Sequence, residues 1–229
     1  PPHPAPHPAP QPYTTTFDGW PPRPDLLSLV PSNFVIVTTE GSGSQFMIDM
    51  LDSNPHIVTG EELLLAGSHR GKQSSGAQEV IQEFYGRSRA GAAKGFKAVS
   101  ESQWGGCEWS TSGRTECGGN AEYFRHAGVK KVIFLWRLNK VRHLVSEISL
   151  HQKTGAHPKS AKDLAEGRKY RPTLPTGSNF DKHIQKWAAE VAKAEHEYHA
   201  FESIHVHYED IMATNPSCGD VWTRIQEFV

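Results

Sequence analysis

One segment near the N-terminus constrains the fold more than any other. Residues 34–51 read FVIVTTEGSGSQFMIDML, an apolar run of strand character, then a loop with two glycines, then an amphipathic stretch. We interpret this order as strand, loop and helix. The backbone N–H groups of residues 42–45 would then lie at a helix N-terminus, where unpaired donors and partial positive charge suit a phosphate or sulfate group. A tight turn with a capped helix is the alternative.

The loop differs from two well-known phosphate-binding motifs. The GxxxxGK[ST] loop of nucleotide triphosphatases needs a lysine, and none lies between Glu40 and Leu51, so ATP or GTP hydrolysis is not expected. The GxGxxG motif of dinucleotide folds needs a third glycine where this chain has Phe46. Any anion site here must therefore use a different arrangement.

Strand and helix patterns alternate along the rest of the chain. Strands are expected at residues 56–59, 95–99, 129–137 and 204–211, and helices near residues 77–85, 121–127, 141–151 and 184–201. This spacing predicts an α/β fold of three layers, with a central parallel sheet between helices. Ligands of such sheets gather at the carboxyl ends of the strands. Both the first loop and the turn after Trp136 lie at such ends.

The helix predicted near residues 141–151 has a clear apolar face. Val141, Leu144, Val145, Ile148 and His151 recur at helical spacing, which predicts that they face the core.

The charge balance excludes some function classes. The 229 residues include 24 Lys and Arg against 25 Asp and Glu, so no overall charge draws the chain to nucleic acid or to an anionic membrane. No stretch approaches the roughly 20 apolar residues of a membrane span, and the start lacks the pattern of a signal peptide. The length suits one α/β domain with a tail.

The tail is rich in proline. Residues 1–12 read PPHPAPHPAPQP, and repeated proline removes backbone donors and fixes φ, which predicts an extended linker. We expect residues 1–30 to be a linker or stalk and residues 31–229 to be the folded domain. Such a spacer is typical of a stalk between a membrane anchor, here outside this sequence, and a lumenal domain, but it also occurs on soluble proteins.

Three cysteines bear on the compartment. Cys107 and Cys117 bracket a polar stretch, and a disulfide between them would stabilise the fold by about 2–3 kcal/mol in an oxidising compartment. Two free thiols are the alternative. No metal site is expected, because neither cysteine belongs to a CxxC pair or a Cys/His cluster. Cys218 would stay unpaired.

Three segments in order carry a family resemblance. They read TTEGSGSQFMIDMLDSNPHIVTGEELL, LWRLNKVRHLVS, and HVHYEDI followed by WTRIQEFV. They resemble the sulfotransferase family, especially its carbohydrate-directed branches, which carry a PRSGST loop with LLDSHPDIxxxGELL, a helix of the form LRRNLLRRAVS, and a VxYEDL strand. The similarity covers residues 33–229. It implies a P-loop-like sulfotransferase architecture and transfer of a sulfuryl group from 3′-phosphoadenosine 5′-phosphosulfate (PAPS) to a hydroxyl group, with a carbohydrate as the expected acceptor.

The resemblance also implies where the donor binds. The first loop would hold the 5′-phosphosulfate and the second segment the 3′-phosphate, since backbone donors and small hydroxyls fit closely around a phosphate and an arginine fork binds one bidentately. The implied donor-binding residues are Gly41, Ser42, Gly43, Ser44, Gln45, Phe46, Arg137 and Ser146. A surface arginine and an ordinary helix serine are the alternatives for the last two.

Sulfuryl transfer further needs a base for the acceptor hydroxyl and positive charge for the leaving phosphate. The resemblance implies Glu61 as the base, with Glu62 as an adjacent competitor, and Lys97 as a catalytic lysine. A solvated or capping carboxylate and a lysine with a structural partner are the alternatives. His56 and His143 are further candidates, although such histidines are more often structural.

One departure affects the expected activity. Gly41 stands where the family has an arginine or lysine, and losing that cation would raise the barrier by on the order of 2–4 kcal/mol. Lys97 or Arg142 could replace it. If the missing cation instead limits the reaction, Gly41→Arg is expected to raise the rate. The alternatives are a catalytically weak or inactive sulfotransferase-fold binding protein and another P-loop-type nucleotide-binding enzyme.

Three further expectations concern the whole protein. The chain ends before the glycine and basic loop that cytosolic members close over the donor, so we expect a C-terminally incomplete domain. The stalk and the disulfide favour the Golgi or secretory lumen, with the cytoplasm as the alternative. Acceptor choice is expected to depend on the loops at residues 67–76 and 159–178.

Overall fold

The computed structural model describes residues 32–60, 77–86, 92–99, 120–153, 172–212 and 214–229. In chain order the elements are β1 (Asn33–Thr38), α1 (Ser44–Asp52), β2 (Ile57–Gly60), α2 (Ala77–Gly86), β3 (Ala93–Val99), α3 (Asn120–His126), β4 (Val129–Trp136), α4 (Lys140–Lys153), α6 (Ser178–Glu197), β5 (Glu202–His207), α7 (Tyr208–Ile211) and α8 (Cys218–Phe228).

The strands form one sheet of order β2-β3-β1-β4-β5, and every neighbouring pair is parallel. β1 lies in the centre, where its apolar and β-branched residues are buried from both sides. In the register of the sheet, Ile36 of β1 pairs with Lys97 of β3 and Ile133 of β4. The predicted α/β fold with a parallel sheet is confirmed.

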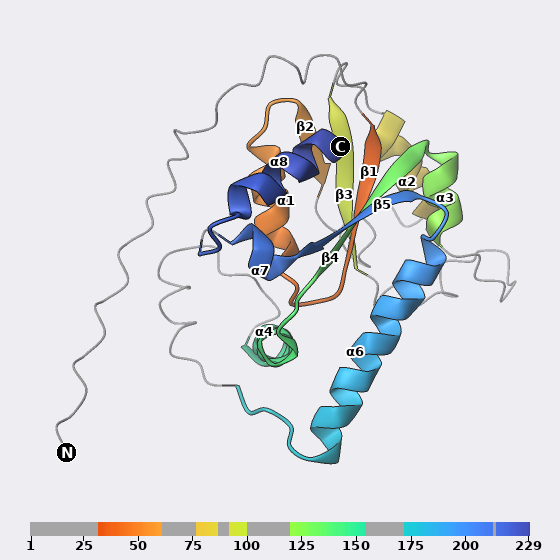
Figure 1. Ribbon diagram of the computed structural model, residues 1–229. Helices are drawn as coiled ribbons and strands as arrows, with labels where there is room; N and C mark the ends of the chain where they lie inside the picture. Colours follow the sequence, from red (N-terminus) through yellow and green to blue (C-terminus); the bar gives the residue numbers. More distant parts are fainter. Residues whose placement is uncertain (1–31, 61–76, 87–91, 100–119, 154–171, 213) are drawn as a thin grey trace, which may run out of the picture.

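Helices cover both faces of the sheet (Figure 1). Val35 and Val37 of β1 face a core that includes residues of α2, α3 and α6. Phe34 and Ile36 face the other way, into a core shared with α1, α7 and α8. This alternation along one strand produces three layers, as the sequence predicts.

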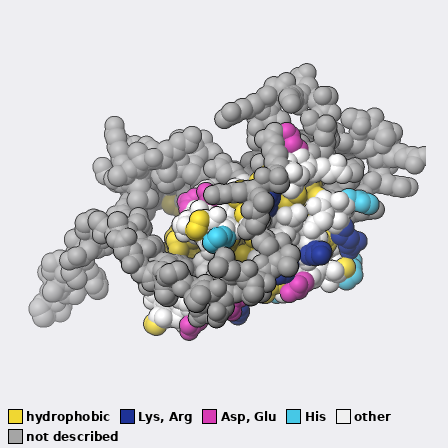
Figure 2. Space-filling view, turned by 90° about the horizontal axis from the view of Figure 1, so that it is seen from above, with side chains coloured by type: hydrophobic (Ala, Val, Ile, Leu, Met, Phe, Trp, Pro, Cys, Tyr) yellow, Lys and Arg dark blue, Asp and Glu magenta, His cyan; other side chains and the backbone are white. Residues whose placement is uncertain are grey.

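Three connections meet at the carboxyl edge of the sheet, the lower edge in Figure 1. They are the loop from β1 to α1, the turn from β4 to α4, and the junction of β5 with α7. At the opposite, amino edge, Figure 2 shows Lys, Arg and His side chains gathered on the side of α3, whose last turn carries Arg125 and His126.

Two details of the predicted elements were wrong. The strand predicted at residues 204–211 ends at His207, and Tyr208–Ile211 forms α7. The alternating pattern continues beyond His207, but there Glu209 accepts hydrogen bonds from the β4–α4 turn, a tertiary contact that the alternation does not encode. On α4, Leu144 is 2% exposed as predicted, whereas Val141 is 48% exposed. Val141 lies in the first turn of the helix, at the carboxyl edge.

Some predictions fall outside the described residues. These are the proline-rich linker, Glu61, Glu62, the loop at residues 67–76, Cys107, Cys117 and most of the loop at residues 159–178. Cys218 is a free, partly buried thiol. Among the described residues, no helix combines the length and apolar character needed to cross a membrane.

Candidate functional site

The loop after β1 is pressed between α4 and α7. Gly41 and Gly43 have φ values of +74° and +85°, a left-handed conformation that favours glycine. A Cβ atom on Gly43 would lie 2.1 Å from the ring of Tyr208, and one on Gly41 would lie 3.0 Å from the backbone nitrogen of Glu147. Both positions therefore require glycine. The expectation that Gly41→Arg raises the rate loses its basis, because the loop has no room for that side chain.

Hydrogen bonds inside the loop fix its shape. Thr39 and Ser42 are fully buried, and their hydroxyl groups lie 2.8 Å apart. The amide of Ser42 also donates to the carbonyl of Thr39 at 3.3 Å. The structure thus turns the Ser42 hydroxyl into the loop interior, where it holds the loop together.

The loop ends at the N-terminus of α1, which has a glycine N-cap and no side-chain cap. The first helical hydrogen bond runs from the amide of Met47 to the carbonyl of Gly43. The amides of the first turn, residues 44–46, therefore have no acceptor within the helix. They are donors available to an anion at the carboxyl edge.

Two predicted loop side chains have other contacts. Gln45 Nε2 donates to Asp49 Oδ1 at 3.0 Å along α1. The Phe46 ring packs edge-on against Tyr208 and Trp222, with centroids 6.3 and 6.2 Å apart. Their side chains thus serve the helix and the core, so a ligand would meet the backbone at these two positions.

Arg137 follows β4 directly and lies partly buried at the same edge. Its guanidinium is 4.3 Å from the centroid of the Tyr208 ring, and Nη1 donates to the carbonyl of Arg142 at 3.3 Å. Its Nε is buried without a hydrogen-bond partner. Burial lowers the pKa of Arg137, while Tyr208 and Glu209 oppose that change. Because an arginine stays protonated, the result is a cation with donor capacity to spare.

Tyr208 connects the two predicted phosphate-binding places. One ring contacts both the position of Gly43 and the guanidinium of Arg137. Ser146 lies on the other side of the loop, where its Cβ would be 3.3 Å from a Cβ on Gly41. The structure thus brings the first loop, Arg137 and Ser146 together at one edge of the sheet.

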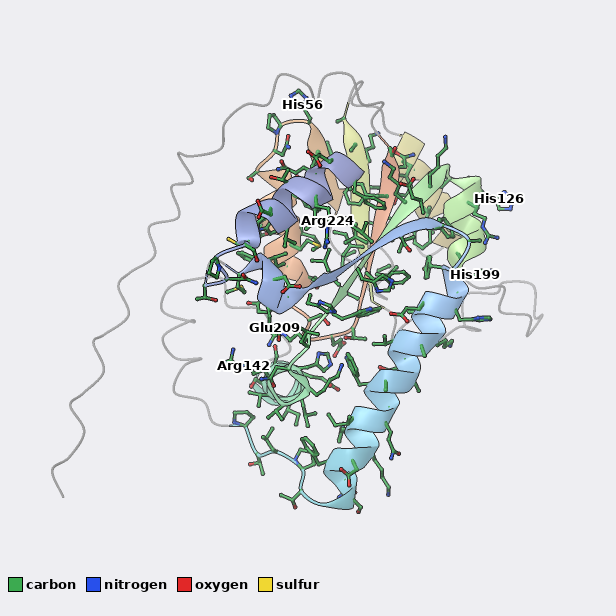
Figure 3. All side chains as sticks on the ribbon, viewed as in Figure 1. His56, His126, Arg142, His199, Glu209 and Arg224 are labelled. Atoms are coloured by element: carbon green, nitrogen blue, oxygen red, sulfur yellow. The ribbon has the colours of Figure 1, made fainter. Side chains whose placement is uncertain are left out.

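Glu209 holds the β4–α4 turn in place. Its carboxylate accepts hydrogen bonds from the amides of Leu138 at 3.0 Å and Asn139 at 3.2 Å. Burial acts to raise the pKa of Glu209, but these backbone donors and Arg137 outweigh it, so the pKa is lowered. The amide of Arg142 on α4, which is labelled with Glu209 in Figure 3, donates to the Asn139 side chain at 3.0 Å.

A second group of polar residues lies where α4 meets α6. His143 of α4 is 3% exposed, and its ring centroid is 5.7 Å from that of Trp187 on α6. Lys140 Nζ lies 3.0 Å from the centroid of the Trp187 ring. Burial and the charges of Arg137 and Lys140 lower the pKa of His143 to about 4, against the opposing effect of Glu209. The imidazole is therefore neutral at pH 7.

Lys97 is buried within the sheet at 4% exposure. Its neighbours Phe96 and Ala98 face the α2 and α3 core, so Lys97 points to the opposite face, the one covered by α1. His56 lies elsewhere, exposed in the turn before β2 at the amino edge (Figure 3), and the structure does not bring it to the site.

Four residues of the site were missed in sequence analysis: Lys140, Trp187, Tyr208 and Glu209. The HVHYEDI segment is interpreted from sequence as a strand and as part of the family resemblance, with no role for Tyr208 or Glu209, although this pair occupies the carboxyl edge. Lys140 could have been suspected from its position near Arg137 and Arg142. Nothing in the sequence points to a site role for Trp187, because its position in the helical pattern predicts a core residue.

No protein-family model matches this chain, and no significant match is found among curated proteins.

Proposed function

We propose that this protein binds PAPS at the carboxyl edge of its sheet and transfers the sulfuryl group to a hydroxyl of a carbohydrate. The observation that carries the proposal is the position of Tyr208. Its ring contacts both the anion-binding loop and the buried Arg137. A donor with phosphate groups at two positions of one nucleoside needs two such anion sites close together.

Each end of the donor has suitable partners. The amides at the start of α1 and the Ser44 hydroxyl would bind the 5′-phosphosulfate. Arg137, with an Nε that lacks a partner, and the neighbouring Ser146 would bind the 3′-phosphate. Hydrogen bonds to charged groups contribute about 1.5–3 kcal/mol each, so Arg137 alone would account for a large share of the affinity.

The transfer step follows from the chemistry of the donor. The acceptor oxygen attacks sulfur, the bond from sulfur to the 5′-phosphate oxygen breaks, and adenosine 3′,5′-bisphosphate (PAP) leaves. Glu61, next along the chain from the end of β2, would take the hydroxyl proton. Lys97, on the α1 face of the sheet, would supply the positive charge that Gly41 cannot.

A binding protein without catalysis is the second candidate. The observation in its favour is the packing of Gly41, which leaves the loop itself without a cation. It predicts intact donor binding and no transfer of labelled sulfate to any acceptor of a glycan panel.

Calorimetric titration with PAP tests donor binding. Arg137→Ala should weaken PAP binding by at least tenfold, because it removes a charged donor. Arg125→Ala is the matched control, since Arg125 also lies over an aromatic ring, Phe201 at 5.3 Å, but outside the site. Absence of PAP binding, equal effects of the two variants, or preference for ATP would contradict the proposal. Transfer from labelled PAPS, and its loss in Lys97→Met, would then separate enzyme from binder.

A further inference from the structure

The contact between α4 and α6 contains donors that the proposed donor site does not use. Two residues contribute three buried side-chain nitrogens without a hydrogen-bond partner, namely both ring nitrogens of His143 and Trp187 Nε1. Buried polar atoms are nearly always hydrogen-bonded, and leaving one unsatisfied costs about 1–3 kcal/mol. Such a concentration in one place indicates a missing partner.

Local partners do not satisfy His143. Its Nε2 is 3.8 Å from Glu147 Oε2, which is beyond hydrogen-bonding distance. Its ring is packed against Trp187, with an angle of 59° between the two ring planes. The side chain is packed against Trp187, and both ring nitrogens are buried without a hydrogen-bond partner.

The chemistry of this group selects an anionic partner. A tryptophan nitrogen can only donate, and a neutral imidazole donates from one nitrogen. The Lys140 ammonium, 3.0 Å from the Trp187 centroid, adds a positive charge beside them. Lys140 and the nearby charge of Arg137 disfavour a metal ion, and no cluster of metal-ligating side chains exists among the described residues. A carboxylate or sulfate group, with several acceptor oxygens, matches these donors.

His143 and Trp187 lie close to the proposed donor site. The carbonyl oxygen of His143 is 3.2 Å from the place of a Cβ on Gly41, so the turn of α4 that carries His143 backs directly onto the donor loop. Within the proposed function, the phosphates of PAPS are already assigned to α1, Arg137 and Ser146. A ligand group at His143 would therefore come from the other substrate.

We propose that His143, Trp187 and Lys140 form an acceptor subsite that binds an oxyanion of the carbohydrate, either the carboxylate of a uronic acid or an existing sulfate ester. The subsite rests on the proposed function for its assignment to the acceptor. It makes acidic glycans better acceptors than neutral ones.

Nuclear magnetic resonance of histidine side chains tests the subsite directly. Protein with labelled histidine is saturated with PAP and titrated with sodium glucuronate, sodium sulfate or glucose, and the His143 signals are identified from His143→Asn. The signals should move with an oxyanion and stay in place with glucose. The tighter of the two oxyanions shows whether the acceptor carries a uronate or a sulfate.

Two tryptophan variants provide the matched comparison. Trp187→Phe removes the unpartnered indole donor and should weaken oxyanion binding by about tenfold. Trp136→Phe should leave it unchanged, because Trp136 Nε1 already donates to Glu195 at 3.3 Å. Equal effects of the two substitutions would overturn the subsite.

The remaining outcomes are distinguishable. His143 signals that respond to neither oxyanion overturn the subsite, whatever the result with PAP. Competition between PAP and the oxyanion also overturns it, because the group would then belong to the donor site. If PAP does not bind at all, the proposed function fails, while movement of the His143 signals would still establish an oxyanion site.

Discussion

The two edges of the sheet treat their buried polar groups differently. At the amino edge, the Tyr85 hydroxyl donates to the carbonyl of Phe34, and the Lys94 ammonium donates to the carbonyl of Tyr85 at 3.2 Å. Lys131 likewise donates to the carbonyl of Phe228. At the carboxyl edge, Arg137 and His143 have buried nitrogens without partners. The polar groups named at the amino edge stabilise the fold, whereas the carboxyl edge combines satisfied groups, such as Glu209, with nitrogens that are left for a ligand.

Buried polar groups can therefore contribute either to the stability of the folded chain or to ligand binding. Satisfied groups stabilise the folded chain, so their removal should lower stability and leave binding intact. Unsatisfied groups reduce stability in the absence of ligand, so their removal should affect binding far more than folding. The carboxyl edge also contains the tightly packed glycine loop at Gly41 and Gly43. We expect substitutions in this loop to reduce stability most.

The largest effect is expected from Gly43→Ala. The new Cβ would lie 2.1 Å from the Tyr208 ring at a φ of +85°, and the combined cost of overpacking and left-handed backbone is about 2–5 kcal/mol. Urea denaturation measures the change. Gly219→Ala is the control, because a Cβ there would meet nothing within 4 Å beyond its chain neighbours and the nearby backbone of its own helix, and stability should rise by up to about 1 kcal/mol. Similar results for both glycines would contradict the packed loop.

How far the sequence predicts this molecule depends on whether a feature is local. The strand, glycine loop and helix around Gly43 follow from neighbouring residues, and the parallel sheet follows from their repetition. The burial of Ser42 does not, because it depends on the hydroxyl of Thr39 and on the loop conformation. The group at His143 depends on Trp187 of a helix that comes later in the chain. Contacts of that kind have no signature in local periodicity.

A second prediction concerns pH and the carboxyl edge. The pKa of His143 is about 4 in the folded chain and near 6.5 when unfolded. Between these values the unfolded chain binds more protons than the folded chain. The contribution of neutral His143 to the free energy of unfolding is therefore fully present above about pH 6.5. It is lost as the pH drops toward 4, by roughly 3 kcal/mol in total. Denaturation at several pH values should show this slope, and His143→Gln should flatten it.

The control for that slope lies at the amino edge. His56 is exposed in the turn before β2, and His56→Gln is the matched histidine substitution. An equal flattening by both substitutions would assign the slope to other groups and remove the evidence that His143 is buried as a neutral ring.

Glu209→Ala should have a smaller effect, about 1–2 kcal/mol, because it removes two backbone hydrogen bonds from a partly exposed carboxylate. Because the pKa of Glu209 is lowered, its contribution is present above the unfolded pKa and is lost as the pH falls through the folded value. Glu202→Ala, on an exposed residue at the start of β5, is the control. Thermal unfolding at pH 7 compares the two, and no loss in Glu209→Ala would show that the turn is held by other contacts.

The smallest effect belongs to Tyr85→Phe, and it tests the comparison of the edges from the amino side. The substitution removes the hydroxyl that donates to the carbonyl of Phe34 and should cost about 1 kcal/mol of stability. Since Tyr85 lies in α2, away from the carboxyl edge, the affinity for PAP should not change. Arg137→Ala should give the reverse result, with weak binding and nearly normal stability, because the lost contact with Tyr208 is offset by removal of a buried unpaired donor. Calorimetry gives the affinity of both variants for PAP, and urea denaturation gives their free energies of unfolding. If Tyr85→Phe weakens binding as much as Arg137→Ala does, the two edges are coupled and cannot be assigned separate roles.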